Sequence, residues 1–271
     1  METKENKRVY RRRGRATVDL ALELEIRKRI QREVDAMMRD IRQQVEKAIK
    51  DHPAADSKTA QDGLPTWFLI QLFRSIRAKW YPRFNQLADE IQKIMTSRAN
   101  SRTRKQIEMK LREYGFSLNY HPTEAQKRTL REIVEQNVKE TKQLAMFVAS
   151  HAQAVIVAAY ERGRDLKYMT DKLAEMGGIA REKAALIARD QMNRTTQQMA
   201  VANAKALGVT RGRWIHVPGY YSSRRTHIRM DGKEFDLSVG MYDPDVGRYV
   251  KPGELKYCNC QFQVIVPGFE E

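Results

Sequence analysis

The chain has 271 residues, of which 41% are hydrophobic and 31% are charged. This length allows two domains, or one domain with an extended arm, and the high charged share favours long helices with one buried stripe over a thickly layered enzyme. The formal net charge of +16 indicates contact with nucleic acid or another acidic surface, with a merely solvated basic surface as the alternative.

The cysteines and the termini exclude further classes of protein. Cys258 and Cys260, the only cysteines, lie too close in sequence to form a good disulfide with each other, which predicts reduced thiols in a cytosolic setting. The N-terminus lacks the apolar core of a secretory signal, and the longest apolar runs, such as LAMFVA, are too short to cross a bilayer. We therefore expect a soluble protein with no membrane partner.

The first part of the chain predicts a flexible basic arm over residues 1–16 and a helical body over residues 17–178. The arm carries seven basic residues against two acidic ones, and it has almost nothing to bury. Apolar residues then recur at three- and four-residue steps over 17–50 and 66–98, on either side of a Pro- and Gly-containing linker. Pro82 is expected to kink or divide the second of these helices.

Two basic clusters are candidate contacts for the phosphates of double-stranded DNA, without sequence preference. The second cluster lies between residues 98 and 112, in a loop and helix face that a solvated surface would explain equally well. The tentative DNA-binding residues of the arm and of this cluster are Arg11, Arg12, Arg13, Arg15, Arg102, Arg104 and Lys105.

A long amphipathic helix is predicted next, beginning at a capping box at Thr123 and ending near Gly163. At 1.5 Å per residue it would be about 60 Å long, which suits a protein that reaches along a partner. Leu130, Ile133 and Phe147 mark its candidate docking face, although the same side chains would serve as core.

The last part of the chain, residues 179–271, is predicted to be a small α+β domain. Two helices, 165–176 and 180–207, are expected to be separated at Gly177-Gly178. Beyond Gly208, alternating residues (RGRWIHV), turn pairs and a final apolar run (FQVIV) indicate short strands. The predicted fold class is thus mostly α, with long amphipathic helices and a small C-terminal α+β domain.

His227, Cys258 and Cys260 form the candidate site, with Asp231 nearby in sequence. They could bind zinc, because thiolate and imidazole are zinc ligands, although C-x-C is less suited than C-x₂-C. They could instead be packed side chains, because free cysteines are commonly buried and inert. A Cys–His nucleophile is the third interpretation, but the chain has no phosphate loop or H-E-x-x-H motif to support an enzyme. We expect the domain to fold without a cofactor, with zinc as the alternative.

The order of motifs resembles the phage head morphogenesis family, the Mu F-like minor capsid proteins. The helix IARDQMNRTTQQMAVANAKALGV leads into RWIHV, then SRRTHIRMDGKEF, then KPGELKYCNCQFQVIV. Two features depart from the family: YYSSR lacks an acidic residue and an Arg before the His, and Gln261 replaces the Arg of C-x-C-R. The residues that carry the resemblance are Ala188, Arg189, Asn193, Arg194, Gly208, Trp214, Arg224, His227, Asp231, Gly232, Pro252, Gly253, Glu254, Cys258 and Cys260.

The resemblance implies a minor head protein of the virion that associates with the portal inside the procapsid and influences packaging or ejection of DNA. It would assemble in the host cytoplasm, with the major capsid or a scaffolding protein as further partners. The alternative is a nuclease-like enzyme with a His/Cys site in the C-terminal domain. We expect an assembly protein with no catalytic residue.

Overall fold

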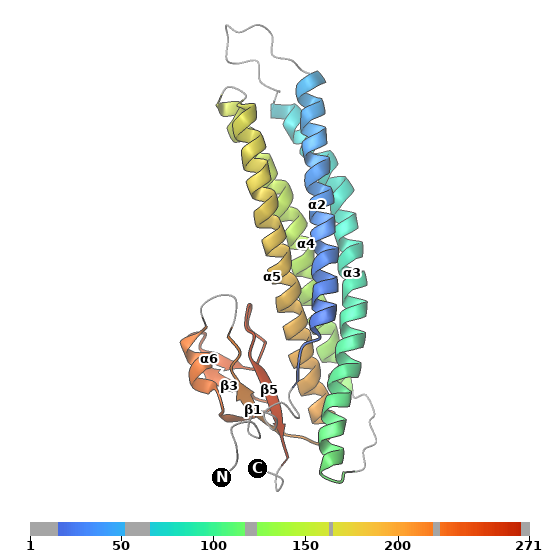
Figure 1. Cartoon of the computed structure of the whole chain (residues 1–271), viewed down its shortest axis with the longest axis vertical. Coiled ribbons are helices and arrows are strands. Elements are labelled where there is room, and N and C mark those ends of the chain that lie inside the picture. The colour runs from blue at the N-terminus through green and yellow to red at the C-terminus, as the bar shows by residue number, and fades with distance from the viewer. Residues whose placement is uncertain (1–15, 52–65, 117–123, 163–164, 219–222, 267–271) are drawn as a thin grey trace. The chain divides into compact units, whose positions relative to one another are not determined.

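The computed structural model describes residues 16–51, 66–116, 124–162, 165–218 and 223–266. Four long helices come first in the chain: α2 (Leu20–Asp51), α3 (Thr66–Glu113), α4 (Glu124–Glu161) and α5 (Leu166–Ala206) (Figure 1). The structure is therefore mostly α with a small C-terminal α+β part, as predicted. Residues 1–15 of the basic arm, the linker 52–65 and the capping Thr123 lie outside the described residues.

The short elements of the C-terminal part are one helix and five strands. In chain order they are β1 (Arg211–Ile215), α6 (Arg225–Met230), β2 (Glu234–Asp236), β3 (Met241–Asp243), β4 (Arg248–Val250) and β5 (Gln261–Ile265).

The chain divides into two compact units. The helical unit comprises residues 24–91 and 137–188, and the mixed unit comprises the residues up to 23, residues 92–136 and the residues from 189 onward. The predicted boundary between residues 178 and 179 differs from this division, because parts of α3, α4 and α5 join the C-terminal elements in the mixed unit. Because three long helices each contribute residues to both units, no single boundary position in the sequence can separate the two units.

The helical unit is a four-helix bundle in which each helix runs opposite to the one before it (Figure 1). Polar contacts join α2 to α3 and α3 to α4, where Arg77 donates to Gln153 Oε1 at 2.5 Å. Lys183 of α5 lies 4.0 Å above the Phe147 ring of α4, and Arg181 pairs with Asp35 of α2 at 3.0 Å. Every neighbouring pair of helices around the bundle is therefore in contact.

Large apolar side chains at three- and four-residue steps fill this bundle. One helix of the described residues, Lys127–Glu161, is long and apolar enough to cross a membrane by length and composition alone, contrary to the expectation from its short apolar runs. Core helices meet the same criterion, and the stretch of α4 within the bundle buries seven hydrophobic side chains there. The main core residues of the helical unit are Ile26, Ile30, Val34, Met37, Ile41, Phe73, Ile76, Trp80, Phe84, Leu144, Val148, Ala152, Ile156, Leu173, Met176 and Ala180.

Two predicted breaks do not divide the helices. α3 continues through Pro82, and α5 continues through Gly177-Gly178, so the two helices predicted over 165–207 are one. The flanking side chains are buried on both sides of each break, among them Trp80 and Phe84 around the proline. Because packing of an apolar face outweighs local propensity, the glycines and the proline are accommodated inside the helices.

The mixed unit is built on a three-stranded antiparallel sheet of order β2-β1-β5, beside a separate hairpin of β3 and β4. In the sheet Trp214 pairs with Phe262, and Gly212 lies opposite both Phe235 and Val264. A Cβ on Gly212 would lie 3.0 Å from both Leu237 and Phe262, which explains a glycine in the central strand. The strands predicted within RGRWIHV and FQVIV thus correspond to β1, which ends two residues earlier, and to β5, which begins and ends one residue earlier.

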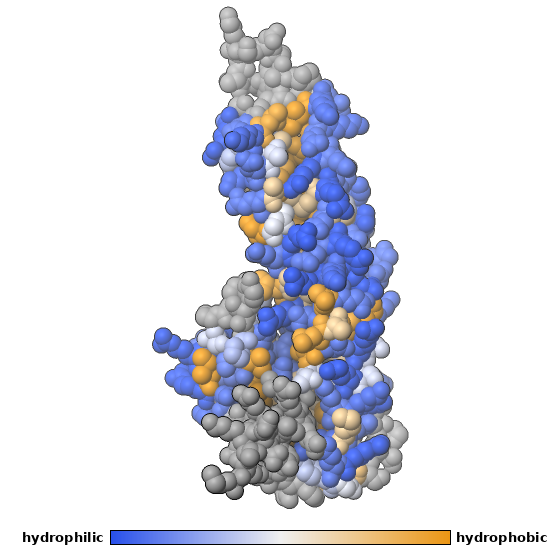
Figure 2. Space-filling model, viewed as in Figure 1, coloured by the Kyte–Doolittle hydropathy of each residue, from blue (hydrophilic) through white to orange (hydrophobic). Residues whose placement is uncertain are grey.

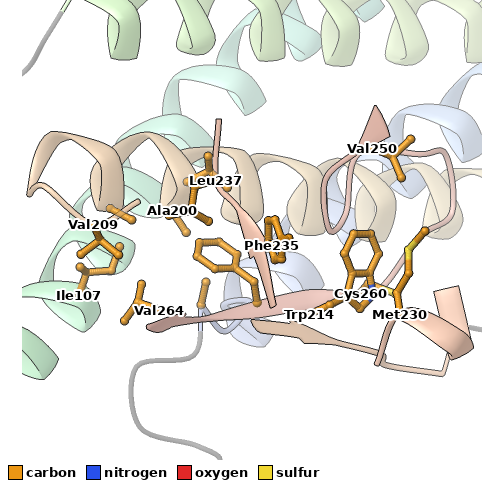
Figure 3. Packing of buried hydrophobic residues seen from close by; sticks show 14 of the residues in the cluster. Ile107, Ala200, Val209, Trp214, Met230, Phe235, Leu237, Val250, Cys260 and Val264 are labelled. Carbon is orange, nitrogen blue, oxygen red and sulfur yellow. The ribbon is translucent and has the colours of Figure 1, made fainter. Parts of the chain in front are cut away.

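One face of this sheet packs against α5 and α3 (Figure 3). The sheet contributes Trp214, Phe235 and Phe262, and the helices contribute small or branched side chains such as Ala200 and Ile107. Near the start of the described chain, the Ala16 N–H donates to the Phe262 carbonyl at 3.2 Å. Figure 2 shows that hydrophilic residues cover most of the described surface in that view, as expected of amphipathic helices around such cores.

Asp40 is the polar link between α2 and α3 in the helical unit. Its carboxylate accepts hydrogen bonds from Trp80 Nε1 at 2.6 Å, Lys79 Nζ at 2.8 Å and Gln44 Nε2 at 3.0 Å. Burial raises the pKa of Asp40, but the three hydrogen bonds and the Lys79 charge together outweigh it and hold that pKa below its usual value.

We predict that Asp40→Asn lowers the free energy of unfolding at pH 7 by about 1–3 kcal/mol, since hydrogen bonds to the ionised carboxylate are weakened. A carboxylate with a lowered folded-state pKa stabilises the protein above the unfolded-state pKa, and that stability is lost as pH falls through the folded-state pKa. The difference in the free energy of unfolding between Asp40→Asn and the unmodified chain should therefore become smaller when urea denaturation is measured at more acidic pH. The exposed Asp171→Asn variant is the control, and a difference that stays constant with pH would contradict the account.

Candidate functional site

Two thiols and one imidazole meet in the mixed unit. His227 lies on α6, whereas Cys258 and Cys260 lie just before β5. The His227 Nδ1 atom is 3.3 Å from Cys258 Sγ and 3.7 Å from Cys260 Sγ, and the three ligand atoms all lie within 4.8 Å of one another. All three residues are at most 3% exposed. The structure therefore brings together the three residues that the sequence singled out, which we call the His–Cys–Cys cluster.

Asp243, which sequence reasoning did not single out, orients the imidazole of the cluster. Its Oδ2 atom lies 3.2 Å from His227 Nε2, and its carboxylate is completely buried. Because a carboxylate can only accept, Nε2 must carry the proton, and in the neutral ring the lone pair is then on Nδ1, facing the sulfurs. Trp214 packs edge-on against the same ring at 5.2 Å, which further fixes its plane.

The two thiols share a proton unequally. A hydrogen bond from the Cys260 thiol, with a smaller contribution from the N–H and charge of a protonated His227 ring, outweighs burial and holds the pKa of Cys258 well below its ordinary value. The same hydrogen bond, together with burial and the charge on Cys258, raises the pKa of Cys260. Cys258 is therefore the thiol that ionises first, and its negative charge lies beside an imidazole.

The backbone around the two cysteines is held by α5. The Asn193 Nδ2 group donates to the Cys258 carbonyl at 2.7 Å and the Cys260 carbonyl at 3.4 Å. Carbonyls two residues apart point the same way in an extended chain, so the two side chains also share a face. This geometry explains how a C-x-C sequence directs both sulfurs at one imidazole.

A strained residue precedes the first cysteine. Tyr257 has a φ of 62°, in the left-handed region that non-glycine residues seldom adopt, and its N–H donates to Asp190 Oδ1 at 2.5 Å. Asp190 in turn forms a buried ion pair with Arg194, one turn further along α5. The turn into Cys258 is thus held by a buried carboxylate that a buried guanidinium compensates.

Gln197 and Gly253 extend these contacts along the same face of α5. The Gln197 side chain donates to the Ala16 carbonyl at 2.8 Å and accepts from the Phe262 N–H at 3.3 Å. A Cβ on Gly253 would lie 2.8 Å from Gln197 and 3.0 Å from Asn193, so the glycine allows the chain to approach the helix. The buried polar run 190–197 therefore holds the segment 253–262, which the sequence did not reveal because polar helix residues are usually exposed.

His216 is a second residue that sequence reasoning did not single out. Its Nδ1 atom lies 3.5 Å from Cys260 Sγ, while its backbone N–H donates to Asp231 Oδ1 at 2.7 Å. Asp231, expected near the cluster, is exposed and is not part of the group of ligand atoms. Its role in the structure is to fix the chain after β1.

The remaining motif residues have supporting positions. Trp214 is fully buried in the core, Gly232 adopts a φ of 76° in the turn after α6, and Arg224 donates to the Lys256 carbonyl at 3.0 Å. Arg189 is half-buried on α5. The motif of the C-terminal part thus encodes the core, the turns and the anchors around the cluster.

The tentative DNA-binding residues lie on different faces of α3, as far as the structure describes them. Arg102 and Lys105 are exposed, and Arg102 donates to the Thr17 carbonyl at 3.2 Å. Arg104 is half-buried and lies 3.6 Å from Glu108, so it belongs to another face of the helix. Arg11, Arg12, Arg13 and Arg15 lie outside the described residues.

These features define a helix-rich protein whose C-terminal part is organised around a buried His–Cys–Cys cluster. Residues 150–263 match the family described as phage Mu protein F like protein. The matched region contains the cluster and its anchors on α5, and the match bears out the resemblance predicted from the sequence. The match indicates a bacteriophage head morphogenesis protein with a virion-associated location. No match to the chain was found among curated proteins or among solved structures.

We predict that Asp190→Ala lowers the free energy of unfolding of the mixed unit by about 3–5 kcal/mol, because it leaves the buried Arg194 charge without its carboxylate. Urea denaturation of the full chain measures this loss. Glu182→Ala, which removes an exposed acid from the same helix, should change it by less than about 0.5 kcal/mol. An equal loss of unfolding free energy in Asp190→Ala and Glu182→Ala would show that the buried Asp190–Arg194 ion pair does not stabilise the protein more than an exposed acid does.

Proposed function

We propose that the chain is a minor head protein that binds the portal and non-specifically contacts packaged double-stranded DNA, acting in head morphogenesis and in DNA packaging or ejection. The observation that carries this proposal is the family match over residues 150–263. The protein would be present inside the head, after assembly in the host cytoplasm with the major capsid or a scaffolding protein as further partners.

A basic stripe on α3 supports the contact with DNA. Arg98, Arg102, Lys105 and Arg112 are exposed and follow one another at steps of four, three and seven residues, which keeps them on one side of the helix. The net charge of +16 adds a general attraction to an anionic partner. Because the side chains are aligned and the contacts are ionic, the stripe suits the DNA backbone rather than a particular base sequence.

The structure changes which residues of α4 can serve as a docking face. Ile133 is 1% exposed and packs with Ala99 and Met199, and Leu130 packs against the same cluster. Phe147 is half-buried and carries Lys183 over its ring. Ile133 is therefore a core residue of the mixed unit and Leu130 packs against that core, so substitutions there would test folding rather than portal binding.

A catalytic role is less well supported than an assembly role. Cys258, His227 and Asp243 are aligned as a nucleophile, a base and an orienting carboxylate would be, but all three are at most 3% exposed. The cavity of about 600 Å³ in the mixed unit is lined by residues of α4, α5 and the loop after β4, such as Glu132, Lys205 and Lys251, and by none of these three. Among the described residues the thiol is thus buried and lies apart from this cavity, which favours the assembly role.

Replacing Arg102, Lys105 and Arg112 with Ala should weaken binding to duplex DNA and flatten its salt dependence. Each lost phosphate contact reduces the slope of log K against log salt by about 0.9, so three contacts give a change of up to about 2.7. Fluorescence anisotropy with a duplex at several salt concentrations measures the slope.

A variant with Lys139, Lys142 and Lys167 changed to Ala is the matched control, because it removes the same charge from exposed positions outside the stripe. An equal loss of slope in both variants would show that only net charge matters. A slope unchanged from the unmodified chain in the stripe variant would rule out α3 as a DNA contact.

Co-expression of the chain with the portal protein of the same phage should yield a complex that remains together on gel filtration. In the phage, a stop codon in the gene should produce heads that lack the protein and contain or deliver less DNA, and the gene supplied from a plasmid should restore them. Absence of both the complex and the protein from purified heads would refute the assembly role.

A further inference from the structure

We propose that the His–Cys–Cys cluster is a structural zinc site, with Cys258, Cys260, His227 and His216 as its four ligands. The sequence alone favoured no metal, because C-x-C is an unusual spacing for a pair of zinc thiolates. In the folded structure, however, both sulfur atoms lie close to one imidazole nitrogen, which the sequence spacing did not indicate. This inference concerns the folded mixed unit and is independent of the role proposed in the phage head.

The first argument is the distance between ligand atoms. Zinc bonds of about 2.3 Å to sulfur and 2.0 Å to nitrogen in a tetrahedron separate a sulfur from a nitrogen by about 3.5 Å. His227 Nδ1 lies 3.3 Å from Cys258 Sγ and 3.7 Å from Cys260 Sγ, and His216 Nδ1 lies 3.5 Å from Cys260 Sγ. All three separations are within about 0.3 Å of the tetrahedral value.

The second argument is the group behind the imidazole. A zinc-bound histidine usually donates its other ring N–H to a carboxylate, which fixes the ring and makes the ligating nitrogen more basic. Asp243 accepts from His227 Nε2 at 3.2 Å, so the nitrogen that faces the sulfurs is the one with a free lone pair. Burying the Asp243 carboxylate costs free energy, which a nearby zinc ion would offset but two neutral thiols would not.

His216 is a better fourth ligand than Asp231, because its Nδ1 atom already lies 3.5 Å from Cys260 Sγ. Its ring lies outside the group of three converging ligand atoms, so zinc binding requires it to move towards Cys258 and His227. A structural zinc site is closed by four protein ligands, most often sulfur and nitrogen. His216 is half-buried directly after β1, and the hydrogen bond from its N–H to Asp231 fixes the backbone there. Asp231 thereby positions a ligand, while its own carboxylate remains exposed.

A catalytic Cys–His–Asp arrangement is the competing explanation of the same residues. It would need one thiol beside the imidazole and access for a substrate, whereas here a second thiol lies close to the same nitrogen and the residues are buried. Two sulfurs facing one nitrogen are what a zinc ion requires. The ion would join the ends of β1, α6 and the segment before β5, which no disulfide does.

The test is the metal content of the full chain, purified without chelator and dialysed against metal-free buffer. Elemental analysis should find one zinc per chain, and cobalt in its place should give the visible bands of a tetrahedral site and a thiolate-to-cobalt charge-transfer band. The Cys258→Ser, Cys260→Ser double variant should lose both, and His151→Ala, an exposed histidine of the helical unit, should keep both. A folded, unmodified chain that binds no more zinc or cobalt than the double variant would overturn the proposal.

Two further measurements remain decisive where the double variant does not fold. Asp243→Asn, which preserves side-chain volume, should weaken zinc affinity about 10–100-fold in a competition titration. Iodoacetamide should modify Cys258 of the unmodified chain slowly, and faster once a chelator has removed the metal. Unchanged affinity in Asp243→Asn, or rapid alkylation of Cys258 that a chelator does not alter, would contradict a zinc site.

Discussion

The buried polar face at the end of α5 is the constraint on which the C-terminal part of the structure depends. Asp190, Asn193 and Gln197 project from successive turns and satisfy backbone groups of a distant segment that runs through both cysteines into β5. Unsatisfied backbone groups in a buried place would cost a few kcal/mol each, so these side chains fix the path of that segment rather than merely touching it. The strained Tyr257 persists because that path is over-determined.

Several features of the structure follow from this constraint. Because Asn193 binds two carbonyls two residues apart, the cysteines face the same way and reach His227 together. Because Gln197 also holds Ala16 and Phe262, the start of the described chain and the edge of the sheet are joined to the same helix. The matched region of the chain is therefore a set of interlocking anchors around one small buried cluster.

The sequence predicted elements well where the pattern was long and regular, and poorly where burial overrode it. Periodic apolar residues predicted α4, and alternation predicted β1 and β5. The glycine pair Gly177-Gly178 predicted the end of a helix, but α5 continues through it because the residues on both sides are packed in the core. The polar residues between 190 and 197 are buried, which their sequence did not indicate. His227, Cys258 and Cys260 were identified because they are rare residue types, whereas His216 and Asp243 depend on the approach of distant segments, which no local pattern encodes.

The central claim is that the two thiols positioned by α5 and the imidazoles of His227 and His216 bind one zinc ion as a closed site. X-ray absorption at the zinc edge of the purified full chain tests it most directly, because it reports the ligands themselves. The account predicts a first shell of two sulfur atoms at about 2.3 Å and two nitrogen atoms at about 2.0 Å, with the outer-shell scattering of imidazole. A first shell of oxygen and nitrogen without sulfur would contradict it.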